Sequence, residues 1–222
     1  MANISDSKKR NLKEPDQFTT AGALALKFLM ENKKIIYIAL FCLILIGFIL
    51  TGAQYYLSAT EQKAYVFFNK GVEATLKTEN DPSKDFEEVL ARYPNTEAGK
   101  LAVLVYGDYA YKKGDYDKAI GLYEKGLKSF ANNPDVKSLI LYGIASCYET
   151  KKDYKTASSY FVNMVDMKSG ILKDWAHYRL GCIYETMQDV TEARTQYEKL
   201  IEGYPESTYY QKAKNRAERL KS

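Results

Sequence analysis

The chain has 222 residues, 46% of them hydrophobic, and a formal net charge of +4. Residues 1–53 carry +3 of that charge, so the remaining 169 residues are almost neutral and lack the basic surface expected of a nucleic-acid-binding protein. A segment of that length is long enough for one ordinary domain with its own core.

The N-terminal segment divides into two parts. Residues 1–16 are polar and unpatterned, which predicts disorder. From Gln17 to Asn32, apolar residues recur at helical spacing. This pattern is typical of an amphipathic helix on a membrane surface, or of an extension of the helix that follows. The sequence leaves both interpretations open.

An uncharged apolar run, Ile35 to Ala53, follows the tail. A helix rises about 1.5 Å per residue, so the run just crosses a hydrocarbon core of about 30 Å. It has no polar face, which argues against a buried helix of a soluble domain. A cleaved signal peptide is the alternative, although the run exceeds the usual signal core of about 7–15 residues. We therefore predict a transmembrane helix at residues 35–53.

The charges beside this run predict its orientation. Lys27, Lys33 and Lys34 lie within ten residues before the run, whereas Lys63 alone lies within ten residues after it. Lysine and arginine resist export. Residues 1–34 are therefore expected to stay in the cytoplasm, and residues 54–222 to form an exported domain behind a single membrane span.

The exported part is expected to be all-α. Four prolines fall in polar clusters between apolar segments: Pro82, Pro94, Pro134 and Pro205. No segment alternates apolar and polar residues, as a half-buried strand would. The pattern predicts a series of short helices separated by turns.

These helices repeat. The segments 112–127, 151–165 and 187–201 align at offsets of 38 and 36 residues. Each copy has a small residue, then an alanine, then an aromatic residue at fixed places, which fits two antiparallel helices whose backbones approach closely around one ring. These repeat-packing residues are Gly107, Ala119 and Tyr123; Ala145, Ala157 and Phe161; and Gly181, Ala193 and Tyr197.

The spacing resembles the tetratricopeptide repeat, most closely in the third copy, which has Leu180-Gly181, Tyr184, Ala193, Tyr197 and Pro205. The place of the leading tryptophan differs, since it holds Val103, Leu141 and His177. The resemblance implies an α-solenoid with a degenerate first repeat and a polar capping helix. The expected units are residues 60–94, 100–133, 138–171 and 174–207, and a cap at 207–220.

Stacking of this kind implies a concave groove lined by the first helix of each repeat. Residues three before, one after and four after each small residue face it, and Trp175 and Arg179 are expected on the same wall. Tyrosine, tryptophan and arginine are frequent anchors in protein interfaces. The predicted groove residues are Leu104, Asp108, Tyr111, Tyr142, Ser146, Glu149, Trp175, Tyr178, Arg179, Cys182 and Glu185.

The whole layout resembles a narrower family. A short basic tail, the phrase LALKFLMENKKI at residues 24–35, one span and an exported repeat array are similar to the YfgM-type ancillary subunits of the bacterial SecYEG translocon. That resemblance implies an inner-membrane protein whose periplasmic repeats contact translocon subunits and periplasmic chaperones. The phrases YPNTEAGKLA and YPESTYYQKA are also similar to cell-division and outer-membrane-assembly repeat proteins.

Nothing in the sequence indicates catalysis. The single histidine, His177, falls at a repeat-packing place, and no phosphate-binding loop or nucleophile elbow occurs. Cys147 and Cys182 lack a neighbouring cysteine and could be free or paired. We therefore expect no cofactor, metal ion or small-molecule substrate, and no enzymatic activity.

Two functions remain open at this stage. One is a protein-binding adaptor at the inner membrane that serves the translocon and chaperones. The alternative is a structural scaffold for cell-envelope machinery that works through self-association. An enzyme would require a catalytic group that the sequence does not reveal.

Overall fold

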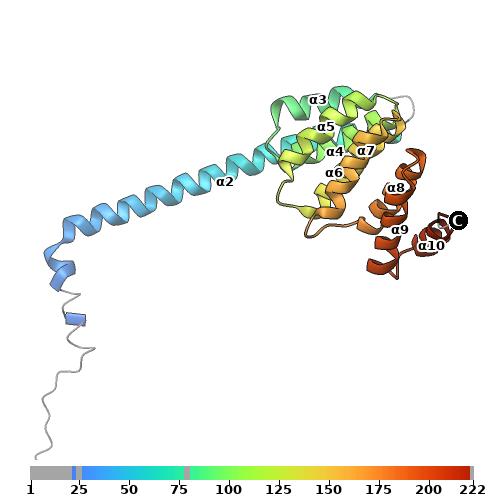
Figure 1. Ribbon diagram of the computed structural model, residues 1–222. Helices are drawn as coiled ribbons and strands as arrows, with labels where there is room; N and C mark the ends of the chain where they lie inside the picture. Colours follow the sequence, from blue (N-terminus) through green and yellow to red (C-terminus); the bar gives the residue numbers. More distant parts are fainter. Residues whose placement is uncertain (1–21, 24–26, 78–80, 221–222) are drawn as a thin grey trace, which may run out of the picture. The chain divides into compact units, whose positions relative to one another are not determined.

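The computed structural model describes residues 22–23, 27–77 and 81–220, and every regular element in them is an α-helix (Figure 1). The chain forms two compact units, residues 1–57 and 58–222. The all-helical fold class predicted from the sequence is confirmed. The predicted disorder of residues 1–16, and the first part of the predicted amphipathic helix, lie outside the described residues.

The first unit contains the whole apolar run. A turn at Asn32 separates helical residues 27–31 from helix α2, Lys33–Leu76. An 18-residue window of α2 has a mean hydropathy of 2.7, and none of that window is buried. By length and composition, this helix can cross a membrane.

Helix α2 also corrects a sequence expectation. The sequence predicts a transmembrane helix at residues 35–53 that is separate from the first repeat unit at residues 60–94, but α2 runs from the first into the second without a break. The connecting sequence, QYYLSA at residues 54–59, contains neither proline nor glycine, so nothing in it stops a helix.

The second unit is a series of helix hairpins, each of which packs on the next in chain order. The end of α2 packs on α3 through Phe68 and Gly71 against Phe86, α4 pairs with α5, α6 with α7, and α8 with α9, while α10 closes the series (Figure 1). The helices are α3 Ser83–Arg92, α4 Glu97–Lys112, α5 Tyr116–Ser129, α6 Pro134–Thr150, α7 Tyr154–Asp166, α8 Lys173–Thr186, α9 Val190–Gly203 and α10 Tyr210–Arg219.

The turn inside each of the last three hairpins is the same. An aspartate caps the second helix, and its carboxylate accepts the N–H three residues on, at 3.1–3.2 Å. The residue before each aspartate has a positive φ: Gly114, Lys152 and Gln188. This left-handed residue ends the first helix, and the aspartate starts the second, so three equivalent sequences fold into three equivalent hairpins.

Ring-on-small-residue packing holds each hairpin together. Gly107 lies against the Tyr123 ring, so closely that an added Cβ would be 2.8 Å from it, and Gly181 lies in the same way against Tyr197. Phe161 and Ala145 are both fully buried in one cluster in the hairpin of α6 and α7. The rings and small residues that the sequence pairs are therefore neighbours in the structure.

The degenerate first hairpin uses the same device. Gly71 faces the Phe86 ring, where an added Cβ would lie 2.8 Å from the nearest ring atom. Phe86 in turn stacks on Tyr106 of α4 at 5.3 Å between ring centroids. Gly71 precedes Gly107 by 36 residues, a repeat spacing that was not predicted from the sequence.

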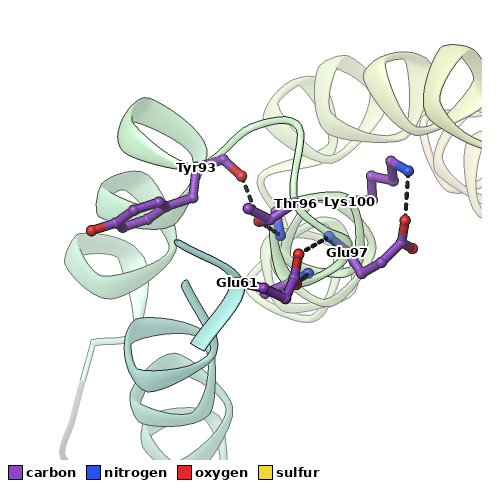
Figure 2. A network of polar contacts seen from close by, with 7 residues as sticks. Glu61, Tyr93, Thr96, Glu97 and Lys100 are labelled. Atoms are coloured by element: carbon purple, nitrogen blue, oxygen red, sulfur yellow. Dashed lines mark hydrogen bonds and ion pairs between the residues drawn. The ribbon is translucent and has the colours of Figure 1, made fainter. Parts of the chain in front are cut away.

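A carboxylate from α2 caps helix α4 (Figure 2). Glu61 accepts the backbone N–H of Glu97 at 3.0 Å and that of Ala98 at 2.9 Å, while Thr96 accepts the N–H of Gly99 at 2.9 Å. A helix start leaves its first N–H groups without partners, and a negative charge there is favourable. Glu61 therefore fixes the last part of α2 to the first full hairpin.

Candidate functional site

The predicted groove residues lie on three first helices, α4, α6 and α8. Six of the eleven line one open pocket of about 310 Å³, which Thr150 completes. The six are Tyr111, Tyr142, Ser146, Glu149, Trp175 and Arg179. Residues up to 68 positions apart in the chain thus share one small surface.

Aromatic side chains form one wall of this pocket. The Tyr142 and Trp175 rings meet edge to face at 4.7 Å between centroids, and Trp175 meets the buried Phe161 ring in the same geometry at 5.4 Å. Tyr142 is 39% exposed. Edge-to-face pairs hold their rings in a defined orientation. The wall is therefore an exposed aromatic surface supported from below by the core.

Polar groups form the other wall. Arg179 and Glu149 make an ion pair, and the Arg179 guanidinium lies 5.8 Å from the centre of the Trp175 ring. The Tyr111 and Thr150 hydroxyls are 3.3 Å apart. The Nε of Arg179 is buried and has no hydrogen-bond partner. The pocket therefore offers hydroxyls and a paired guanidinium beside aromatic rings, a combination typical of protein-binding surfaces.

Leu104 and Asp108 lie on α4, outside this pocket. Leu104 is half-buried and packs against the core near Gly126. Asp108 is exposed and accepts the Tyr123 hydroxyl at 2.5 Å. Burial raises the pKa of Tyr123, and the hydrogen bond to Asp108 raises it further, so this tyrosine stays neutral.

Tyr178, Cys182 and Glu185 face helix α10 and do not line the pocket. Tyr178 stacks on Tyr209 at 5.1 Å between centroids. Glu185 accepts the Tyr197 hydroxyl at 2.6 Å and pairs with Arg216 at 2.9 Å. The expectation of an open groove is wrong here, because α10 stacks on α8 and α9 as a further first helix would.

Several groups around the groove were not predicted from the sequence. Thr150 lines the pocket, and Phe161, predicted only for packing, supports Trp175 from below. Two leucines, Leu101 and Leu139, take the place of Trp175 in the earlier repeats and are 36% and 46% exposed. The repeat offsets of 38 and 36 residues place all three at one position, so the register alone could have identified them.

Other features of the described residues are less suited to a site. A larger hollow of about 470 Å³ lies beside α3 and α5, but its Lys118 and Tyr106 both bind Glu87, at 3.3 and 2.8 Å. No group of three or more possible metal-ligating side chains occurs in the residues that the structure covers. Cys147 and Cys182 are free thiols, and burial raises the pKa of Cys147 to about 11.

The stacked hairpins and the pocket across their first helices define a helical-repeat protein of the kind that mediates protein–protein interaction. The chain belongs to the family described as "Tetratricopeptide repeat-like domain", whose sequence profile matches residues 27–220. Domains of this family are interaction modules rather than typical enzymes.

A known protein matches part of this chain in sequence. The chain is 34% identical over 100 residues to "General transcriptional corepressor trfA" from Dictyostelium discoideum. That match covers 45% of the chain but only 7% of the relative's length.

Two solved structures are similar in fold. "Crystal structure of MamA protein" has a TM-score of 0.54 and 17% identity, covering 71% of this chain and 85% of that one. "First TPR of Spaghetti (RPAP3) bound to HSP90 peptide SRMEEVD" has a TM-score of 0.44 and 26% identity, covering 55% and 90% respectively. The first likeness supports the solenoid fold.

Proposed function

We propose that this protein is a membrane-anchored adaptor whose groove binds other proteins at the bacterial inner membrane. The observation that carries the proposal is the pocket at Tyr142, Trp175 and Arg179, where residues of three helices present exposed aromatic surface beside a paired guanidinium. Buried aromatic and arginine anchors supply most of the energy in protein interfaces.

The membrane anchor is part of this proposal. It is supported by the unburied apolar window of α2 and by Lys27, Lys33 and Lys34 before it. Large apolar side chains along this helix, such as Phe41 and Phe48, are 66% and 74% exposed. Such a surface is stable in lipid but not in water. The proposed topology is single-pass, with a cytoplasmic N-terminus and a periplasmic repeat unit.

The proposed partners are subunits of the Sec translocon and periplasmic chaperones that handle exported proteins. This assignment rests on the resemblance to the YfgM-type family, carried by the basic tail, the entry phrase at residues 24–35 and the exported repeats. It predicts that the groove contacts segments of proteins during export.

Topology is tested with a tag after Ser222 in intact spheroplasts. The proposal predicts that added protease removes the tag, and that the N-terminus is degraded only after lysis. A protected C-terminal tag would place the repeats in the cytoplasm and exclude a periplasmic role.

Partner binding is tested by cross-linking the full chain in native membranes and identifying the captured proteins. Tyr142→Ala combined with Tyr111→Ala, at two tyrosines that line the pocket, is expected to abolish capture while the helical circular dichroism signal is retained. Glu124→Ala on α5, an exposed change on a second helix, is the matched control and should capture normally. Capture of the chain's own copies in place of translocon subunits would instead favour the self-associating scaffold.

A further inference from the structure

The charges of the predicted groove residues are not balanced. The set holds three carboxylates, from Asp108, Glu149 and Glu185. Glu149 pairs with Arg179, and Glu185 pairs with Arg216 of α10. Both pairs join one first helix to the next. The two cations neutralise two of the three acids, which leaves the charge of Asp108.

Among the described residues, Asp108 accepts one hydrogen bond, and that bond does not neutralise its charge. Its Oδ1 accepts the hydroxyl of Tyr123, a tyrosine that burial keeps neutral. The carboxylate itself is exposed. A net negative charge therefore faces solvent on α4, one turn before Tyr111.

Aromatic surface continues from Asp108 into the pocket. Tyr111 follows Asp108 by three residues on the same helix face, and Tyr111 lines the pocket with Tyr142 and Trp175. A lysine or arginine can interact both with a carboxylate and with the face of a neighbouring ring. Such a cation would be stabilised at Asp108 and Tyr111, with apolar residues beside it on the Tyr142–Trp175 wall.

We propose that the groove selects segments that carry a lysine or arginine next to apolar residues, and that Asp108 supplies this selectivity. The inference rests on the proposed binding function of the same groove. Electrostatic complementarity of this kind determines the choice of partner and the association rate more than the total affinity. The favoured partner is thus a basic, partly apolar polypeptide segment.

The chain provides its own reporter for the test. Trp175 is its only tryptophan and lies in the pocket, so its fluorescence reports groove occupancy. Full-length protein in non-ionic detergent is titrated with three synthetic peptides that share one leucine–phenylalanine framework and differ only in bearing lysine, glutamine or glutamate. The lysine peptide should bind tightest and the glutamate peptide weakest. Added salt should reduce the difference between their affinities.

Asp108→Asn is the decisive variant, because its amide oxygen can still accept the Tyr123 hydroxyl while the charge is lost. The lysine peptide should bind Asp108→Asn about threefold to fivefold more weakly, as expected for an exposed ion pair. The glutamine peptide should bind both proteins equally. Glu124→Gln removes the same charge from α5 and should leave all three affinities unchanged.

A second variant is expected to act in the opposite direction. Arg179→Gln removes the cation that neutralises Glu149, so the lysine peptide should bind about twofold to fivefold more tightly. Equal affinity for the three peptides, with Asp108→Asn unchanged, would overturn the charge selectivity but leave the groove as a binding site. No fluorescence change with any peptide would overturn both.

Discussion

The interval between α6 and α8, meaning the space between these two helices, is built like the interval between α8 and α10. The first is open, whereas the second is covered. In each, an arginine of the later helix pairs with a glutamate of the earlier one, Arg179 with Glu149 and Arg216 with Glu185. The first interval forms an open pocket. The second is covered by Tyr209, which stacks on Tyr178.

The aromatic residue beneath each pair explains much of the difference. Tyr197 lies under the second pair, and its hydroxyl donates to Glu185, so the glutamate is tied to the core as well as to the arginine. Phe161 lies under the first pair and has no hydroxyl, and Trp175 packs on its ring. In these two intervals, the apolar ring of Phe161 accompanies an open pocket, and the hydroxyl-bearing ring of Tyr197 accompanies a covered one.

The largest expected effect comes from the small residue beneath the covered interval. Gly181→Ala would place a Cβ in contact with the Tyr197 ring, closer than real Cβ atoms approach, so ring and helix must shift. We expect a loss of about 2–3 kcal/mol in the free energy of unfolding, measured by urea titration with Trp175 fluorescence. The same change at Gly121, where an added Cβ meets nothing, should instead stabilise by about 0.5–1 kcal/mol. Equal effects at the two sites would remove the packing explanation.

Removing the arginine of each pair compares the intervals directly. Arg216→Met takes a charged partner from a Glu185 that also holds the Tyr197 hydroxyl, so a loss of about 1–2 kcal/mol is expected in the same urea titration. Arg179→Met should cost less, because the two pairs are about equally exposed but Phe161, beneath the first, has no hydroxyl to bind Glu149 as Tyr197 binds Glu185. A larger loss of stability for Arg179→Met than for Arg216→Met would contradict this account. It would show that the Glu149 pair stabilises the solenoid more than the Glu185 pair.

Removing only the hydroxyl gives a smaller effect. Tyr197→Phe makes the covered interval resemble the open one and should cost about 0.5–1.5 kcal/mol, the usual net value of one hydrogen bond. Thermal unfolding followed by circular dichroism measures this loss. Because Arg216 still pairs with Glu185 in this variant, a loss as large as that of Gly181→Ala would contradict the account.

The smallest expected effect is a pH dependence of the folding stability, and it arises in the last repeat. Burial lowers the pKa of His177, and the hydrogen bond to Gln196 at 2.9 Å opposes this only in part. The unfolded chain therefore binds a proton more readily than the folded one, and stability should fall as the pH drops below about 6.5. Leu141 takes the place of His177 in the previous repeat, so His177→Leu should abolish this part of the pH dependence in urea titrations at pH 7 and pH 5.

The repeat register could be predicted because the packing of a small residue against a ring depends on local spacing. Gly107 with Tyr123 and Gly181 with Tyr197 follow from that spacing, and so does the sharing of one face by Tyr142 and Trp175. The contacts that the sequence did not predict join helices from different repeats or cover an end. Glu61 reaches α4 over 36 residues, and no local pattern marks the link.

The role of α10 shows the same limit. Arg216 follows Arg179 by 37 residues and could have been recognised as its equivalent. The segment that contains it is short and polar, however, and was predicted only as a cap. That Tyr178 and Glu185 contact it becomes evident only once α10 is seen to stack on the last hairpin.

The most direct test of the account is a photo-activated cross-linker placed at Tyr142 in the full chain, in living cells. The groove should yield discrete adducts with other proteins from this position, and the same cross-linker at Glu124 on α5 should yield none. Adducts from Glu124 alone, or equally from both positions, would contradict the assignment of the groove as the binding surface.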